Sequence, residues 1–168
     1  MAVNQGKAFE ARFKSDFLKV KGASLDRIYD SVSGFKGIKN ICDFIGYIFP
    51  YAYYLECKST KQNTFSIQKL TQYDKLIEKK GIKGVNAGAV IWFIEKNRVC
   101  FVPIEEFERL KYAGYKSINV KMLDDPEFDV YEIPSEIKRK YPACDFTEML
   151  RIADNKFNKE WGNSNEDR

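Results

Sequence analysis

The sequence contains no histidine among its 168 residues. This absence excludes every Ser/His/Asp or Cys/His triad, every imidazole general base, and the zinc sites that mix histidine with cysteine. Any chemistry that the chain performs must therefore depend on carboxylates, on lysine or on a hard metal ion.

Paired cysteines and long apolar runs are also missing. The four cysteines lie far apart in the sequence, so no CxxC pair is present to hold zinc or to carry out dithiol chemistry. We expect buried thiols in a reducing compartment. No apolar run approaches the roughly 18 residues that a membrane span needs, and the N-terminal residues lead directly into a charged amphipathic segment. These absences predict a cytoplasmic protein.

The composition is that of a folded chain without repeats or low-complexity segments. Hydrophobic residues make up 44% and aromatic residues 15%, enough to fill a packed interior. The length corresponds to about one domain. We expect a single domain over residues 1–161, followed by a disordered tail over residues 162–168.

The net charge of +4 is unevenly distributed along the chain. Basic residues exceed acidic residues in the first half, where they alternate with Tyr and Phe, and the second half has the opposite excess. Such a basic half would suit a phosphate backbone. The alternative is a solvated lysine face of an ordinary cytosolic protein, and composition alone favours that alternative.

Hydrophobic periodicity predicts an amphipathic helix near the N-terminus. Residues 5–20 place Phe9, Phe13 and Phe17 on one face, and the helix ends at Gly22. The same spacing predicts further helices over 67–80, from Pro103 onward with acidic residues in the first turn, and over 145–161 after a capping box formed by Asp145 and Glu148.

Segments rich in aromatic and β-branched residues predict the strands. Residues 41–48 and 51–59 form a hairpin around Phe49 and Pro50, and we expect a loop longer than two residues because proline cannot adopt the positive φ of a type I′ turn. Residues 85–94 and 99–102 predict a buried strand and its partner, and 115–133 predict short strands and turns. This order indicates an α/β (α+β) fold, with helices packed on a central mixed sheet.

The hairpin brings chemically active residues together. A hairpin centred on Phe49 and Pro50 places Asp43 directly opposite Glu56, with Lys58 on the same face two residues further on. The other face is expected to be wholly apolar, and its members are Cys42, Phe44, Ile48, Tyr51, Tyr53, Leu55 and Cys57.

Two adjacent carboxylates repel each other unless a cation lies between them, and oxygen ligands of this kind select Mg²⁺ or Mn²⁺. Lysine cannot be a ligand, but it can hold a metal-bound water or stabilise charge on phosphorus. These groups could hydrolyse a phosphodiester without histidine. The alternative is a surface ion-pair cluster, which a Glu-x-Lys tripeptide on its own would favour.

Asp43, followed after twelve residues by Glu56-Cys57-Lys58, resembles the signature of the PD-(D/E)XK nucleases. The Asp-to-Glu spacing, the polar residues Lys61 and Asn63, and a glutamine on the next helix are similar more narrowly to the RecU-type Holliday junction resolvases. The similarity covers roughly residues 5–103. It implies a restriction-endonuclease-like core with the order αβββαβ.

The resemblance also implies roles for individual residues. Asp43 and Glu56 correspond to the metal ligands, and Lys58 to the group that orients water or stabilises charge. Glu10 matches an acidic residue on the first helix that could reach the metal through water, although a solvated helical glutamate is the alternative. Gln72 matches the family's glutamine, and Gln68, one turn earlier, is its competitor.

One departure from the RecU pattern concerns the stalk that grips the junction centre. Here the corresponding place is held only by residues 31–40, whose Lys36 and Lys39 we expect, with Lys61, to contact DNA. A compact, stalkless relative such as those encoded by phages would fit this pattern. A bacterial or phage-infected cell is the implied setting.

We therefore expect a Mg²⁺-dependent endodeoxyribonuclease that resolves branched DNA, with Mn²⁺ able to substitute. Two symmetric nicks imply a homodimer. The alternatives are a restriction-like or repair nuclease that cuts duplex or flap DNA, and a DNA-binding module without catalysis.

Overall fold

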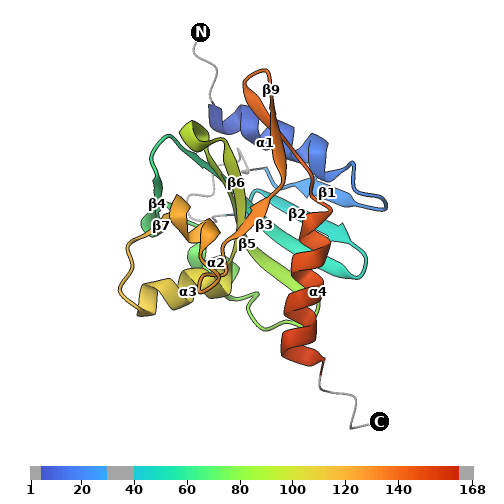
Figure 1. The fold of residues 1–168 in the computed structure, drawn as a ribbon. Coiled ribbons are helices and arrows are strands. Elements are labelled where there is room, and N and C mark those ends of the chain that lie inside the picture. The colour runs from blue at the N-terminus through green and yellow to red at the C-terminus, as the bar shows by residue number, and fades with distance from the viewer. Residues whose placement is uncertain (1–4, 30–39, 163–168) are drawn as a thin grey trace, which may run out of the picture.

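The computed structural model describes residues 5–29 and 40–162. Six strands form the central sheet in the order β1-β2-β3-β5-β6-β8 (Figure 1). All neighbours are antiparallel except β3 and β5, which are parallel, so the sheet is mixed as predicted. The strands are β1 (Ser24–Arg27), β2 (Phe44–Ile48), β3 (Tyr51–Thr60), β5 (Val85–Phe93), β6 (Arg98–Pro103) and β8 (Tyr131–Ile133).

Helices cover both faces of the sheet, and alternation along β5 shows how. Val90 and Trp92 pack with α1 (Gln5–Phe17) and α4 (Glu148–Trp161), while Ala89 and Ile91 pack with α2 (Tyr73–Ile77) and α3 (Ile104–Tyr112). Because β5 is buried on both faces, its sequence is an almost unbroken apolar run. The predicted α/β class and the order αβββαβ are confirmed.

The first helix forms as its periodicity predicts. Phe9, Phe13 and Phe17 are almost fully buried, because a spacing of four residues keeps them on the face that meets the sheet. Gly46 in β2 permits this close approach, since a Cβ there would lie 3.0 Å from the Phe17 ring.

The hairpin has the predicted register, with Phe44 opposite Leu55 and Ile48 opposite Tyr51. The expected longer loop is wrong: Phe49 and Pro50 form a two-residue turn with a cis peptide bond between them, and not the type I′ turn that proline excludes. The expected placement of Cys42 is also wrong. It precedes β2 and packs into the core beneath α2 and α3, because strand alternation does not extend to a residue outside the strand.

The single helix predicted over 67–80 is broken. The segment forms a 3₁₀ turn, η1 (Ile67–Lys69), then the short α2, with Leu70 between them outside the helical region at φ −82° and ψ 78°. The Ile67 N–H donates to the Lys116 carbonyl oxygen, so the start of the segment is tied to the chain after α3. The small sheet of β4 (Thr64–Ser66) and β7 (Ser117–Asn119) lies beside it.

In the C-terminal third, residues 115–133 form short elements as predicted, and α4 agrees with the helix predicted over 145–161. The predicted capping box is wrong, because the Asp145 carboxylate accepts from the Thr147 N–H and hydroxyl and so closes a turn before the helix. A hairpin of β9 (Ser135–Lys138) and β10 (Tyr141–Cys144) was not predicted. The remaining elements are η2 (Ile94–Lys96) and η3 (Val120–Asp124).

The predicted loop over 31–40 lies outside the described residues except for Asn40, and the predicted tail over 162–168 does so except for Gly162. Within the described ranges, no helix is both long and apolar enough to cross a membrane.

Candidate active site

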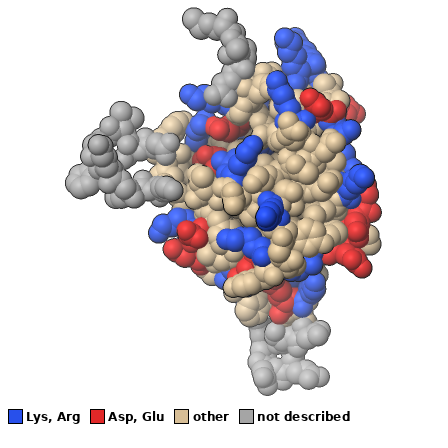
Figure 2. Space-filling model, turned by 90° about the vertical axis from the view of Figure 1, so that its left-hand side faces the viewer, with Lys and Arg blue, Asp and Glu red and all other residues tan. Residues whose placement is uncertain are grey.

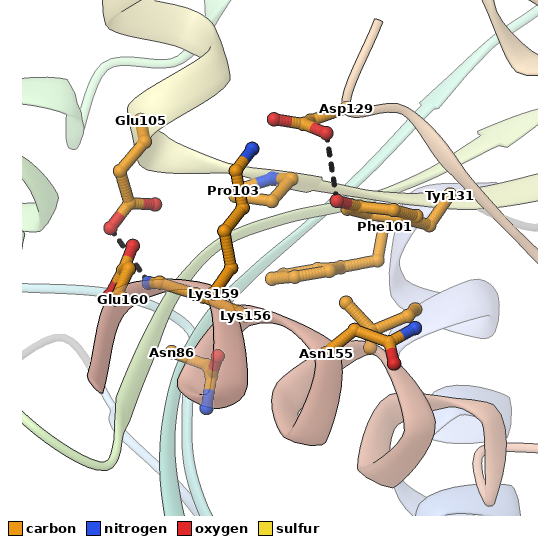
Figure 3. Close-up of a pocket in the computed structure, with 11 residues that line it drawn as sticks. Asn86, Phe101, Pro103, Glu105, Asp129, Tyr131, Asn155, Lys156, Lys159 and Glu160 are labelled. Carbon is orange, nitrogen blue, oxygen red and sulfur yellow. Dashed lines mark hydrogen bonds and ion pairs between the residues drawn. The ribbon is translucent and has the colours of Figure 1, made fainter. Parts of the chain in front are cut away.

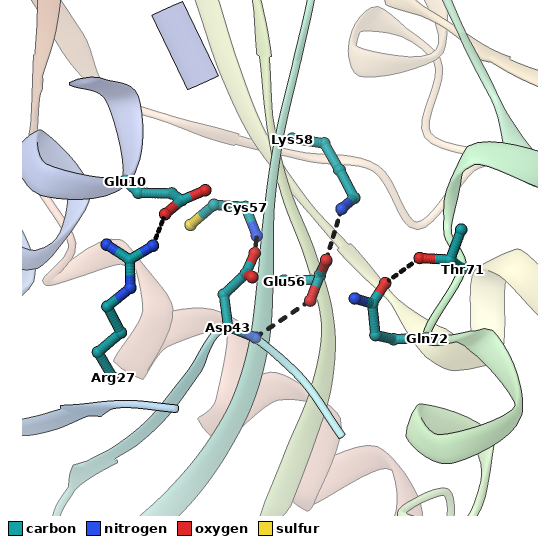
Figure 4. Close-up of polar contacts among 8 residues, drawn as sticks. All are labelled: Glu10, Arg27, Asp43, Glu56, Cys57, Lys58, Thr71 and Gln72. Carbon is teal, nitrogen blue, oxygen red and sulfur yellow. Dashed lines mark hydrogen bonds and ion pairs between the residues drawn. The ribbon is translucent and has the colours of Figure 1, made fainter. Parts of the chain in front are cut away.

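Asp43 and Glu56 meet where β2 begins, held by two hydrogen bonds (Figure 4). The Asp43 N–H donates to Glu56 Oε2 over 3.1 Å, and the Cys57 N–H donates to Asp43 Oδ2 over 2.9 Å. Each carboxylate is thus bonded to the backbone of the other strand. The predicted juxtaposition of Asp43 and Glu56 is present.

Lys58 lies on the same face of β3 as Glu56, because side chains two residues apart along a strand point the same way. Its Nζ is 2.5 Å from Glu56 Oε1. The Lys58 side chain remains 25% exposed while that of Glu56 is fully enclosed. The ammonium group therefore lies between the buried carboxylate and the solvent from which a substrate would approach.

Glu10 reaches the same region from α1, where its side chain forms an ion pair with Arg27 of β1. Burial raises the pKa of Glu10, the negative charge of Asp43 raises it further, and Arg27 and Lys58 oppose the shift. Glu10 thus lies within electrostatic range of Asp43 and Lys58. Sequence reasoning did not assign Arg27 to the site, since only the pairing of β1 with β2 brings it there.

The two candidate glutamines point to different places. Gln72, at the start of α2, directs its amide nitrogen toward Glu56, and its Oε1 accepts a hydrogen bond from the Thr71 hydroxyl (Figure 4). Gln68 instead lines a separate hollow beside Lys111 and Tyr115. The structure therefore brings Gln72, and not Gln68, toward the carboxylates.

The electrostatics around Glu56 are unbalanced. Burial is the largest cause of a rise in the pKa of Glu56 to about 7, and the charge of Asp43 adds to it. Lys58 and the Asp43 N–H lower the pKa but do not cancel the rise. A second cation near the two carboxylates would favour the ionised form of Glu56.

The donor set fits a hard divalent cation. Asp43 and Glu56 supply only oxygen atoms, and burial raises the pKa of the neighbouring Cys57 thiol well above its usual value, so that group stays protonated. No three Asp, Glu or Cys side chains of residues 5–29 and 40–162 converge on one point. Mg²⁺ is commonly held by one or two carboxylates, with waters and substrate phosphate as its other ligands.

The predicted DNA-contacting lysines are only partly visible. Lys61 is exposed in the turn directly after β3, whereas Lys36 and Lys39 lie outside the described residues. Lysine and arginine side chains are spread over the face in Figure 2, with acidic side chains among them. Basic side chains therefore do not form one continuous patch on this face.

A cavity of about 150 Å³ lies beside α4 (Figure 3). Glu105 of α3 contacts it and pairs with Lys156 over 2.7 Å through Oε1, while Oε2 is buried without a hydrogen-bond partner in the described part of the chain. None of the predicted site residues lines this cavity, so it is separate from the carboxylate pair. The other lining residues include Asn86, Phe101, Pro103, Tyr131 and Lys159.

Comparison with known proteins bears on the fold. No family model matches this chain, and neither does any curated protein. Among solved structures, the chain is similar to the 1.6 Å structure of Hjc from Archaeoglobus fulgidus, a Holliday junction resolvase from an archaeal hyperthermophile. The match has a TM-score of 0.51 and 18% sequence identity, and covers 68% of this chain and 88% of that one. The chain thus has the restriction-endonuclease-like fold of this resolvase structure.

Proposed function

We propose that this protein is a divalent-metal-dependent endodeoxyribonuclease that resolves four-way junctions or other branched DNA by paired phosphodiester hydrolysis. The observation that carries the proposal is the hydrogen-bonded pair of Asp43 and Glu56 with Lys58 beside it, in a fold similar to that of a resolvase. The chain has no histidine, so hydrolysis has to depend on carboxylate and lysine groups such as these.

The carboxylates of Asp43 and Glu56 would hold the metal, Mg²⁺ or in its place Mn²⁺. Such an ion polarises a phosphoryl oxygen and lowers the pKa of a bound water. Lys58 can orient the attacking water and stabilise the charge that develops on phosphorus, because its ammonium group faces solvent beside Glu56.

Two further residues would position the reactants. The Gln72 amide, which points toward Glu56, has N–H groups to donate to water or phosphate. Glu10 would act through water, and Arg27 limits its movement by pairing with it. We assign Gln72 and Glu10 as positioning residues.

Symmetric nicking of a junction requires two active sites related by a two-fold axis, so a homodimer belongs to this proposal.

The narrower resemblance to RecU-type enzymes remains a prediction, as does junction contact by Lys36 and Lys39. Neutralising both lysines is expected to weaken four-way junction binding more than duplex binding, which a titration of each DNA would measure. Equal weakening of junction and duplex binding would mean that residues 31–40 contact phosphates without preference for a junction.

Two alternatives use the same residues differently. A restriction-like or repair nuclease would cut duplex or flap DNA at the same metal site. A binding module without catalysis would bind DNA in a strongly salt-dependent manner and would not cleave it. The cost of keeping two repelling carboxylates together favours an enzyme over such a module.

The test is to incubate the protein with labelled four-way, flap and linear duplex DNA, with and without Mg²⁺. The Glu56→Gln variant serves as the matched control. We expect Mg²⁺-dependent cuts at symmetric positions in the four-way substrate and none by the control. Cleavage of only linear or flap DNA would support the second nuclease, and binding without any cleavage would support the module.

A further inference from the structure

The β9–β10 hairpin carries three consecutive basic residues at its tip. Lys138 is paired with Tyr141, so Arg139 and Lys140 form a two-residue loop. All three basic side chains are exposed, and none of them forms an ion pair with a described residue. Elsewhere in the structure, Arg27, Arg98, Arg109 and Arg151 are each paired with carboxylates.

The backbone at Arg139 is unfavourable for its side chain. Its φ is +65°, in the left-handed region, where a non-glycine residue costs roughly 1–2 kcal/mol. Two-residue hairpin loops with a positive φ at this position usually contain glycine or asparagine. Glycine would therefore suit this turn better than arginine does. The Arg139 side chain forms no ion pair with a described residue that would compensate for the cost of its backbone conformation.

The hairpin is firmly supported along its length. The Cys144 N–H at its base donates to Asp16 Oδ2 over 2.9 Å. Nearer the tip, the Tyr141 ring lies 5.9 Å from that of Trp92, which in turn lies 5.5 Å from Phe9. The hairpin thus lies against α1 and extends beyond it in Figure 1.

These contacts place the hairpin at the same end of the sheet as the candidate active site. Trp92 pairs with Ser59, the residue that follows Lys58, so the hairpin packs at the level of Lys58 along β3, on the face of the sheet that α1 covers. Figure 2 is turned about the vertical axis from Figure 1, so heights agree between the two views. The uppermost coloured side chains in Figure 2 are basic, at the height of this hairpin in Figure 1.

We propose that the β9–β10 hairpin is a DNA-binding element that grips the duplex arm next to the cleaved phosphate through Lys138, Arg139 and Lys140. A two-stranded ribbon has the width that the major groove admits, and the basic tip would contact the flanking phosphates. This inference rests on the proposed nuclease function and adds to it a substrate-holding surface in the C-terminal third of the chain.

The experiment compares three variants with the wild-type protein. Arg139→Gly removes one charge and relieves the backbone. Lys138→Gln with Lys140→Gln removes the other two. Lys83→Gln with Lys159→Gln is the charge-matched control, since Lys83 precedes β5 at its far end and Lys159 lies near the end of α4, away from the hairpin. Binding of a labelled four-way junction is titrated in EDTA at several salt concentrations, and thermal unfolding of each variant is recorded.

We expect Arg139→Gly to unfold at the wild-type temperature or up to roughly 4 °C above it, yet to bind DNA roughly three- to ten-fold more weakly. The hairpin double variant should lower the slope of log affinity against log salt by about 0.9 for each lost phosphate contact, and by more than the control does. A lower unfolding temperature for Arg139→Gly, or equal binding losses in the hairpin and control variants, would overturn the proposal.

The outcome for the hairpin can be separated from that for the nuclease. Binding in EDTA does not depend on cleavage, so a hairpin-dependent loss of affinity in a protein that never cuts DNA would support the hairpin and contradict the nuclease. Cleavage by the wild-type protein, together with hairpin variants that bind DNA as tightly as the wild type, would support the nuclease and contradict the hairpin proposal. Absence of DNA binding by the wild-type protein would contradict both.

Discussion

Asp16 and Glu56 are both almost fully enclosed, with 1% and 0% of their surfaces exposed, yet their pKa values shift in opposite directions. Burial opposes ionisation of Asp16, but hydrogen bonds from Lys19, the Cys144 N–H and Arg12 outweigh burial and lower its pKa. For Glu56, burial and the charge of Asp43 outweigh Lys58 and raise its pKa to about 7.

The two carboxylates differ in the charged groups and hydrogen-bond donors around them. Asp16 has two cations and a backbone donor, and it connects α1 to the β9–β10 hairpin. Glu56 has one cation, one backbone donor and a second anion. A buried carboxylate with complete compensation has a structural role, whereas one that lacks a positive charge can accept a metal ion.

The largest expected effect is on DNA cleavage, which should depend on Glu56 and its neighbour Asp43 but not on Asp16. Asp43→Asn and Glu56→Gln should each lower DNA cleavage roughly 1,000-fold, because each would remove a proposed metal ligand while keeping the shape of the side chain, and DNA binding should stay the same or tighten slightly. Asp16→Asn should still cleave. Single-turnover assays in Mg²⁺ measure this, and substantial nicking by Glu56→Gln would remove that residue from the metal site.

The pH dependence of stability should show the same contrast. The folded pKa of Glu56 lies near 7, above its ordinary value of 4.5, so the folded state binds more protons between these values. Its contribution to the free energy of unfolding is therefore present below about pH 4.5 and is lost, by about 3 kcal/mol, as the pH rises through 7.

Urea unfolding at pH 5 and pH 8 measures this change, with Glu56→Gln as the reference. The wild-type protein should lose more stability than the variant over this interval. Parallel pH profiles for the two proteins would mean that Glu56 is not the titrating group.

Lys58→Ala should lower the cleavage rate roughly 100-fold and change junction affinity much less. In the proposed mechanism the Lys58 ammonium group acts at the reacting centre, whereas for binding it would be only one of several phosphate contacts. Rates at saturating protein separate the two effects. A variant that binds poorly but cleaves normally at saturation would assign Lys58 to binding alone.

Asp16→Asn should lower the free energy of unfolding by about 2 kcal/mol, since Arg12 and Lys19 lose the charge that they share and the bond to the Cys144 N–H is weakened. Thermal unfolding measures the loss. An unchanged stability would show that the enclosure of Asp16 requires no compensation, which would weaken the comparison with Glu56.

The sequence was sufficient to predict the carboxylate pair because the relevant interactions are local. A hairpin turn and strand alternation determine which residues oppose each other, and the residues between Asp43 and Lys58 contain both signals. Helices α1 and α4 were also predicted, since long periodic segments bury one face regardless of their neighbours.

The parts that sequence reasoning missed depend on distant partners. Asp16 bonds to Cys144, and Glu10 pairs with Arg27 on a strand whose neighbour is β2. The segment 67–80 has helical periodicity, but the chain leaves the helical region at Leu70, and the Ile67 N–H at the start of the segment donates to the distant Lys116 carbonyl oxygen. Such contacts between remote segments override local propensity, and no pattern within either segment indicates them.

A calorimetric titration with Mn²⁺, in the absence of DNA, tests the central claim most directly. The claim is that the pair of Glu56 and Asp43 lacks a positive charge, which a metal ion would supply. Asp16, by contrast, already has its charge compensated by Arg12 and Lys19. Wild-type protein and Asp16→Asn should bind Mn²⁺ with the same affinity, and Glu56→Gln should bind it at least about ten-fold more weakly. Equal binding by wild type and Glu56→Gln would contradict the account.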